Sequence, residues 1–348
     1  MPSTYGENRM SASSSAEAMV RVEGLSKVYR PTPRWMRTLV RTVIREDVAA
    51  LEDVSFTVRR GEVCALVGPN GAGKTTTFRI LVGLTTPTSG RATVMGFDCV
   101  SESIAVRQVV GWMPAEERSL LMRLTCAENL YFHGRLQGLR GHDLRSRISA
   151  TLDGVGLGGK ADDAVIALSA GMRARLQLAR AILHDPMVLI LDEPTGSVDP
   201  VAAHEILGMI TSMVEERGMA ALISSHRLEE IEALQSHVVL LDEGNLRYDG
   251  DLEALRRTWD RPRLEVHLST PERAIEAAER IRAVGVGEAE SVDEGTVLLT
   301  PAAGVSVGQL IAELGSLLSE VVDVREIRTP LRDVLAEMYR RRQQSSKQ

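Results

Sequence analysis

Long apolar runs, cysteines and aromatic residues are all scarce in this chain of 348 residues. No run of about 18 apolar residues occurs, so no membrane-spanning helix is expected. The three cysteines, Cys64, Cys99 and Cys126, have neither disulfide nor zinc spacing, which favours a reducing compartment. Residues 1–18 are rich in serine and lack an apolar core, so we expect a disordered tail and no secretory signal. The net charge of −6 argues against a nucleic-acid partner for the chain as a whole.

The order of strand and helix patterns predicts an α/β domain followed by a smaller α+β domain. Strands and helices alternate over residues 19–255, and helical periodicity dominates from Ser101 to Leu157. The pattern changes near Asp260, so residues 262–348 are expected to form a C-terminal accessory domain. Its segments follow the β-α-β-β-α-β order of a ferredoxin-like domain, at 264–268, 271–284, 288–292, 296–300, 306–318 and 321–328. A last helix is expected at 331–341.

A phosphate-binding loop is predicted between an apolar strand, Val63–Val67, and a helix, Thr75–Leu84. The intervening residues fit G-x-x-x-x-G-K-[ST], in which glycines turn backbone N–H groups towards phosphates at a helix N-terminus. Lys74 would reach the β- and γ-phosphates, and the Thr75 hydroxyl would bind Mg²⁺. By itself this loop indicates ATP or GTP. The residues expected to hold the nucleotide are Gly68, Pro69, Asn70, Gly71, Ala72, Gly73, Lys74, Thr75 and Thr76.

The second motif is acidic and follows the apolar segment Met187–Leu191. A strand of this kind is buried and carries Asp192 and Glu193 at its carboxyl end. Asp192 would hold Mg²⁺, and Glu193 would act as general base on the attacking water.

Six motifs in order give the chain a resemblance to the ATP-binding-cassette (ABC) family over about residues 19–255. They are Tyr29, the phosphate-binding loop, Leu168–Met172, Leu191–Thr195, Ser197–Asp199 and Ser224–His226. The resemblance implies a P-loop NTPase fold: a RecA-like core, a helical subdomain at about 112–170 and an antiparallel β subdomain. It also implies ATP and Mg²⁺ as cofactors.

The same resemblance implies roles for residues outside the phosphate-binding loop and the acidic motif. Tyr29 would stack on adenine, and its alternative is a core tyrosine at a strand end. Ser169 and Gly171 would contact the γ-phosphate of ATP held by another protomer, so that the cassette works as a homodimer. His226 would contact the γ-phosphate within its own site, and Asp199 would couple the two sites.

Two motifs depart from the family pattern. The signature usually reads LSGGQ, and here Ala170 and Met172 replace a glycine and the glutamine. Ala170 keeps its backbone N–H, which suffices if its φ is negative. Ala115 stands where a glutamine is expected, so Glu116 is a candidate for the metal-water role, with a solvated acidic loop as the equal alternative. Because two motifs are altered, a slowly hydrolysing sensor remains a third possibility beside the two functions compared below.

Further motifs resemble the ATPases of ABC-2-type exporters, in which the permease is commonly a separate membrane-spanning chain. That resemblance predicts a peripheral subunit at the cytoplasmic face of the membrane, with the loop Trp112–Leu124 receiving the permease. The cargo stays open among drugs, lipids, peptides and glycans. The segments that carry this resemblance are Glu116–Leu120, Arg123–Thr125, Glu128–Leu130, Ser169–Arg175 and His184–Pro186.

An insertion at 31–47 predicts a basic amphipathic helix. Apolar residues from Trp35 to Ile44 fall on one face, with arginines mostly on the other. Such a helix suits an anionic membrane surface or the rim of a permease, and its alternative is packing on the protein's own sheet.

The rival function is a soluble ABC ATPase that acts on ribosomes, DNA or protein assemblies. Ribosome-linked members usually carry two cassettes, and DNA-repair members carry coiled-coil or zinc insertions. This chain has one cassette and neither heptads nor CxxC pairs. The exporter subunit is therefore the favoured hypothesis.

Overall fold

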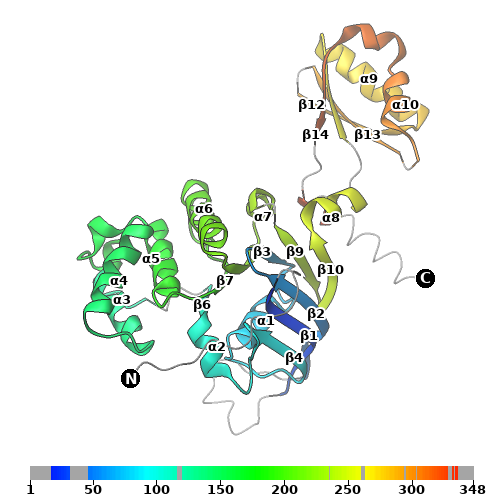
Figure 1. Ribbon diagram of the computed structural model, residues 1–348. Coiled ribbons are helices and arrows are strands. Elements are labelled where there is room, and N and C mark those ends of the chain that lie inside the picture. The colour runs from blue at the N-terminus through cyan, green and yellow to red at the C-terminus, as the bar shows by residue number, and fades with distance from the viewer. Residues whose placement is uncertain are drawn as a thin grey trace. The chain divides into compact units, whose positions relative to one another are not determined.

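The computed structural model describes residues 17–31, 46–115, 120–234, 236–259, 263–293, 295–302, 304–327, 331–332 and 334–335 (Figure 1). The chain divides into two compact units, Met1–Leu252 and Glu253–Gln348. Four expectations lie outside the described residues: the structure of the tail before residue 17, the insertion helix, the role of Glu116 and most of the closing helix. Among the described residues, no helix combines the length and the apolar character needed to cross a membrane.

Six strands form the larger sheet of the first unit, in the order β10-β9-β3-β8-β7-β6 (Figure 1). All pairs are parallel except β9 with β10. β7 and β8 are buried at every residue, which accounts for their apolar sequences. The parallel order brings the carboxyl ends of β3, β8 and β7 to one edge. The bounds are β3 Val63–Val67, β6 Val110–Met113, β7 Val188–Asp192, β8 Ala220–Ser224, β9 His237–Asp242 and β10 Asn245–Asp251.

An antiparallel sheet packs beside this core, in the order β2-β1-β4-β5. Its strands are β1 Ala18–Tyr29, β2 Val48–Arg59, β4 Ser89–Val94 and β5 Phe97–Asp98. Side chains from both sheets and from α1 (Lys74–Leu81) meet in one buried cluster, which includes Val22, Phe56, Leu66 and Phe78. The expected antiparallel β subdomain is thus present and shares the hydrophobic core of the parallel sheet.

Helices form the third part of the first unit. A second buried cluster joins Leu130, Leu144, Leu176 and Ile206, one residue from each of four helices. Thr125 begins α3 with a capping box, and Asp199 caps α6, which Pro200 opens and Gly218 ends. The helices of this unit and its boundary are α2 Ser103–Val109, α3 Cys126–Leu136, α4 Gly141–Gly154, α5 Ala170–Ile182, α6 Pro200–Arg217, α7 Leu228–Leu234 and α8 Leu252–Trp259.

The structure corrects two details of the region between Ser101 and Leu157. Strand β6 interrupts the expected helices and completes the parallel sheet beside β7. Gly111 in β6 lies so close to α5 that an added Cβ would be 2.5 Å from Ala181 O. This close approach between two elements cannot be recognised from the periodicity of the sequence. Leu120, in the loop expected to meet the permease, is only 4% exposed and packs in the helical core. That side chain is therefore unavailable to a partner.

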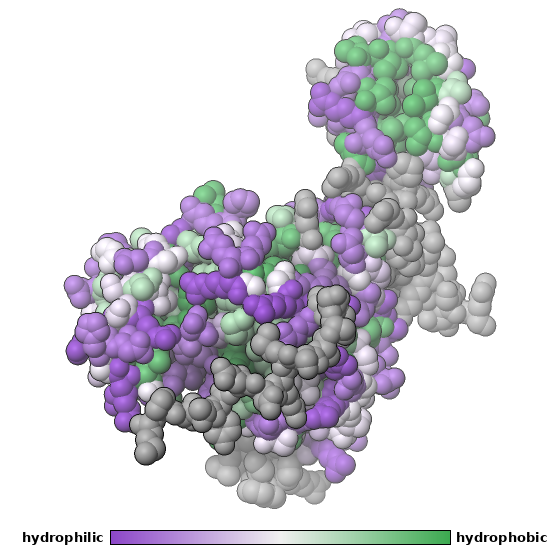
Figure 2. All heavy atoms as spheres, viewed as in Figure 1, coloured by the Kyte–Doolittle hydropathy of each residue, from purple (hydrophilic) through white to green (hydrophobic). Residues whose placement is uncertain are grey.

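The second unit contains one antiparallel sheet, β12-β13-β11-β14, with helices α9 and α10. The elements of this unit follow one another in the predicted β-α-β-β-α-β order. The expected helix 306–318 is instead α10 followed by a 3₁₀ segment, Gly315–Glu320. The helix does not continue because Gly315, the first residue of that segment, has a left-handed φ of 55°. Figure 2 shows apolar side chains gathered on the visible face of this unit. The bounds are β11 Arg263–Leu268, α9 Pro271–Val284, β12 Gly287–Asp293, β13 Thr296–Pro301, α10 Val307–Ala312 and β14 Val321–Ile327.

A charged triplet fixes the start of β9 in the first unit. The His237 side chain is 11% exposed and lies between two carboxylates: Nδ1 is 2.9 Å from Glu62 Oε1, and Nε2 is 2.5 Å from Asp249 Oδ1. Burial opposes a charge on the ring, but the two carboxylates outweigh it and raise the pKa of His237 to about 9. Burial raises the pKa of Glu62, but the contact with His237 and the N–H donated by Arg59 together outweigh burial, so that this pKa is lowered. The triplet is therefore most stable with an imidazolium between two carboxylates.

We expect this triplet to make stability fall at alkaline pH. A folded pKa above the ordinary 6.5 contributes stability that is complete below pH 6.5 and lost as the pH rises through about 9. After allowance for solvent screening the loss should be about 2 kcal/mol. Urea unfolding at several pH values would measure it, with His237→Gln flattening the profile. Replacement of the exposed His204 by Gln is the control, and an equal effect of both variants would contradict the assignment.

Candidate functional site

The glycine-rich loop between β3 and α1 is held where only glycine fits. Gly68 and Gly73 have φ of 155° and 105°. An added Cβ at Gly68 would lie 2.2 Å from Leu241 O, and one at Gly73 would lie 2.6 Å from Ala50 O. Gly73 caps α1 without any side-chain hydrogen bond, so no side chain closes the N-terminus of this helix. The loop and helix start thus form an anion cradle built of backbone N–H groups.

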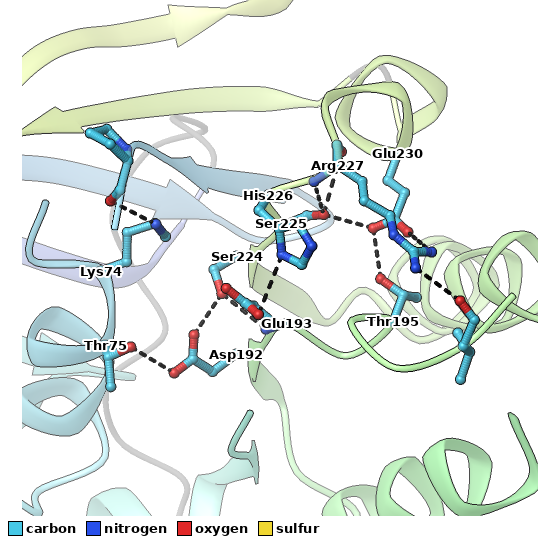
Figure 3. Close-up of polar contacts among 12 residues, drawn as sticks. Lys74, Thr75, Asp192, Glu193, Thr195, Ser224, Ser225, His226, Arg227 and Glu230 are labelled. Atoms are coloured by element: carbon cyan, nitrogen blue, oxygen red, sulfur yellow. Dashed lines mark hydrogen bonds and ion pairs between the residues drawn. The ribbon is translucent and has the colours of Figure 1, made fainter. Parts of the chain in front are cut away.

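Lys74 places a positive charge over this loop (Figure 3). Its Nζ donates to Gly68 O at 2.6 Å and to Pro69 O at 3.1 Å. Burial lowers the pKa of Lys74, while Glu193 and Asp192 oppose that shift. The ammonium group is therefore pre-positioned beside the cradle and compensated only by carbonyl dipoles and by carboxylates farther off.

Asp192, at the end of β7, is held between two hydroxyl groups (Figure 3). Thr75 Oγ1 donates to its Oδ2 at 3.0 Å, and Ser224 Oγ donates to its Oδ1 at 2.7 Å. The carboxylate is only 3% exposed and lies directly opposite Ser224 in the register of β7 and β8. Hydroxyl and carboxylate oxygens are the donors that Mg²⁺ prefers, so Thr75 and Asp192 suit that ion. The structure thus brings together two residues that are 117 positions apart in the chain.

Glu193 projects from a left-handed backbone turn directly after Asp192. Its φ is 51°, and its N–H donates to both Ser224 O, at 3.2 Å, and Ser224 Oγ, at 3.0 Å. Its Oε2 is 3.4 Å from His226 Nδ1 (Figure 3). A non-glycine residue in this conformation is strained, and such strain concentrates at functional sites. The carboxylate and imidazole can together orient and deprotonate a water molecule.

Ser224 was the member of this cluster whose role the sequence did not reveal. It belongs to the motif Ser224–His226, but only its place opposite Asp192 in the sheet shows that it orients both Asp192 and Glu193. The available signal was a polar residue that ends an apolar strand, as Asp192 does in β7.

Tyr29 lies at the end of β1, beside the first turn of α1. Its hydroxyl is 3.4 Å from Thr76 Oγ1, and Lys27 Nζ is 5.0 Å from the centre of its ring. The side chain is half-buried, so the ring is available at the margin of the phosphate cradle.

Ser169, Gly171 and Asp199 lie at the starts of α5 and α6. Ser169 Oγ accepts from Met172 N at 3.2 Å, and Asp199 Oδ1 accepts from Val201 N and Ala202 N at 3.0 Å. The helix turns are close, since a Cβ on Gly171 would be 3.1 Å from Ala202 Cβ. None of the hydrogen bonds found among the described residues joins this group to the glycine-rich loop. Ala170 begins α5 without a positive φ, which meets the condition set for its backbone N–H.

Comparison with known proteins identifies this arrangement. The ABC transporter family model matches residues 51–196. ABC transporter ATP-binding protein NatA of Bacillus subtilis is 38% identical over 60% of this chain and 84% of its own length. Nod factor export ATP-binding protein I of Neorhizobium galegae is 34% identical over 76% and 77%. The chain belongs to the ABC transporter ATP-binding proteins. A solved ATP-binding subunit of an ABC transporter has the same fold, with 28% identity and a TM-score of 0.57 over 69% of this chain and 92% of its own.

Membership in this family settles the nucleotide and the reaction class. ABC ATP-binding proteins bind ATP and hydrolyse it, so the cassette is an ATPase with a P-loop NTPase fold. Solved structures of the same fold include a dimeric cassette bound to ADP and Pi and a cassette that is part of an ABC transporter complex.

We expect Ser224→Ala to raise the Mg²⁺ concentration that ATP turnover requires. The variant removes the hydroxyl that orients Asp192, and loss of such an outer contact typically costs about tenfold or more in metal affinity or activity. Turnover measured across a Mg²⁺ titration would show a raised midpoint. Ser236→Ala is the matched control, because Ser236 is a buried serine whose hydroxyl has no partner among the described residues. An unchanged midpoint would refute the role given to Ser224.

Proposed function

We propose that the cassette is the ATP-hydrolysing subunit of an ABC-2-type exporter and drives a separate permease. The observation that carries the proposal is the cluster in which Thr75 and Ser224 hold Asp192 while Glu193 faces His226. This cluster contains the groups required to bind a metal nucleotide and activate water. The relative named for Nod factor export supports the exporter class. The cargo of this chain remains open.

The proposed reaction assigns one task to each side chain. Gly68, Pro69, Asn70, Gly71, Ala72, Gly73 and Thr76 supply the cradle, with Lys74 reaching the β- and γ-phosphates and Tyr29 stacking on adenine. Thr75 and Asp192 would hold Mg²⁺, whose charge offsets that of the phosphates. Glu193 would remove a proton from water as the oxygen attacks the γ-phosphorus, the bond from that phosphorus to the bridging oxygen would break and ADP would leave. His226 would contact the γ-phosphate.

A homodimer would complete each site. Ser169 and Gly171 belong to a helix start separate from the glycine-rich loop, so a second chain can present them to the γ-phosphate across an interface. Asp199 would then connect the two sites. ATP closes the dimer, and hydrolysis opens it again.

Glu193→Gln should stop turnover while leaving nucleotide binding intact. A glutamine keeps the shape but cannot accept the proton of the attacking water, so kcat should fall by about 100-fold or more. Steady-state phosphate release measures the loss, and titration with a fluorescent ATP analogue measures binding. The control is Glu215→Gln, an exposed change on α6. Equal turnover in wild type and Glu193→Gln would favour a sensor whose hydrolysis is incidental.

A cleft in the first unit is the proposed receptor for the permease. Its volume is about 590 Å³, and it lies between α2 and the helices α3 and α5. Apolar side chains remain exposed on both walls: Ile104 is 70% and Leu136 is 70% exposed. Arg107 and Arg180 add positive charge. A short permease helix with apolar residues and an acidic residue would fit this cleft, which replaces the buried Leu120 as the predicted contact.

Association with the permease can be tested by purification from native membranes. The chain tagged at its N-terminus should recover a polytopic membrane protein in mild detergent, placing it at the cytoplasmic face of the membrane as a peripheral subunit. Ile104→Asp with Leu136→Asp should lose that protein and retain ATPase activity, because neither residue belongs to the catalytic cluster. Ile275→Asp, 51% exposed in the second unit, is the control. Recovery of wild type only from the soluble fraction, alone or with ribosomes or nucleic acid, would support the rival function.

A further inference from the structure

A buried carboxylate on α7 has partners in two separate loops (Figure 3). Glu230 Oε2 accepts from Thr195 Oγ1 at 2.6 Å and from Ser225 Oγ at 2.7 Å. Thr195, Ser225 and Glu230 are 1%, 5% and 8% exposed. Thr195 follows the catalytic Glu193, and Ser225 precedes His226. One carboxylate therefore joins the loop after β7 to the loop after β8.

Arg227 makes a second connection between the same loops. Its Nη1 is 3.3 Å from Glu230 Oε1, and its Nη2 donates to Val198 O at 2.9 Å. Its backbone N–H donates to Ser225 Oγ at 3.0 Å. Val198 immediately precedes Asp199, whose carboxylate caps α6. Arg227, the residue directly after His226, is thus hydrogen-bonded to the peptide group directly before Asp199.

Three contacts in succession along the chain join the two loops, and the first of them is the contact between Glu193 and Ser224. Glu193 N–H donates to Ser224, Thr195 Oγ1 donates to Glu230, and Arg227 donates to Val198 O. Short turns tie the first loop internally, since Gly196 N donates to Glu193 O and Val198 N donates to Thr195 O. A shift of either loop is thereby passed to the other over a short, hydrogen-bonded path.

We propose that Arg227 and Glu230 are positioning residues that couple His226 in a chain's own ATP site to the Asp199 that this chain presents to its partner. The inference rests on the proposed sandwich dimer. Nucleotide that draws in His226 moves Arg227, and Arg227 carries Val198 and Asp199 with it. The γ-phosphate of one site thereby adjusts the other site.

Burial is what makes the two loops move as one unit. If one loop moved alone, the Glu230 charge would stay buried without part of its hydrogen bonding, and Val198 O would lose its cationic donor. An uncompensated buried charge is among the most unfavourable states in a protein interior. The concerted movement keeps every one of these contacts and is therefore the favoured path.

A mixed dimer separates this coupling from a local structural role. Wild-type chain is combined with a large excess of Glu193→Gln chain, so that each active site faces an inactive partner. A second mixture uses an inactive chain that carries Arg227→Met in addition to Glu193→Gln, and the turnover of the two mixtures is compared. The inactive chain's own site is already silent, so any further loss must reach the active site through the surface that this chain presents to its partner, where Asp199 is the residue that Arg227 positions. We expect the wild-type turnover to fall by about fivefold or more, the range of ordinary allosteric coupling.

The control is Glu229→Gln on the inactive chain, an exposed carboxylate next to Glu230 on the same helix. Equal turnover with Glu193→Gln and with Glu193→Gln plus Arg227→Met would overturn the coupling. If Glu193→Gln holds its partner closed, Lys74→Ala silences the chain instead. A wild-type chain that stays monomeric with Mg-ATP would overturn both the dimer and the coupling. Absence of a permease affects only the proposed transport function.

Homodimer kinetics provide the second measurement. Glu230→Gln keeps the shape and one acceptor, and Arg227→Lys keeps the charge but cannot reach Glu230 and Val198 O together. Both should lower the Hill coefficient for ATP towards 1, with kcat reduced more than KM is changed. Thermal unfolding establishes that each variant is folded. Folded variants with wild-type cooperativity and kcat would refute the proposal.

Discussion

Asp192 held between the hydroxyls of Thr75 and Ser224 is the contact on which the catalytic centre depends. It joins the carboxyl ends of the neighbouring strands β7 and β8 to the start of α1, which follows β3 in the same sheet. A buried carboxylate must be hydrogen-bonded, and these two hydroxyls satisfy one oxygen each. The same requirement fixes the start of α1 against the end of β7. The glycine-rich loop and the Asp192 carboxylate are thereby held in a fixed relation to each other.

Ser224 extends this alignment to Glu193, the proposed general base. Its hydroxyl donates to Asp192 and accepts from the Glu193 N–H, so one side chain holds both acidic residues. The left-handed backbone of Glu193 is strained, and the two hydrogen bonds from its N–H to Ser224 help to keep it. The end of β8 thus supports the left-handed turn from which Glu193 faces His226.

The strands and the loop of this site could be predicted because each depends on local sequence. Val63–Val67 was predicted with its observed bounds, since a strand covered on both faces is a continuous apolar run. Strand β6 was not predicted because it is short and lies between helices, and because its glycine is required by close packing against α5. The contact of Arg227 with Val198 spans 29 positions and depends on how two loops fold against each other. No periodicity encodes that geometry.

The altered signature shows which part of a motif the chemistry needs. Met172 replaces an amide with an apolar side chain that packs against the helical core, while its backbone N–H still donates to Ser169 Oγ. Ala170 replaces a glycine and takes an ordinary helical backbone. The groups that would face a phosphate at this helix start are the Ser169 hydroxyl and backbone N–H groups, and neither substitution removes one. A helix N-terminus binds anions through its backbone, so side chains at these two positions can change without loss of the N–H groups that the proposed phosphate contact requires.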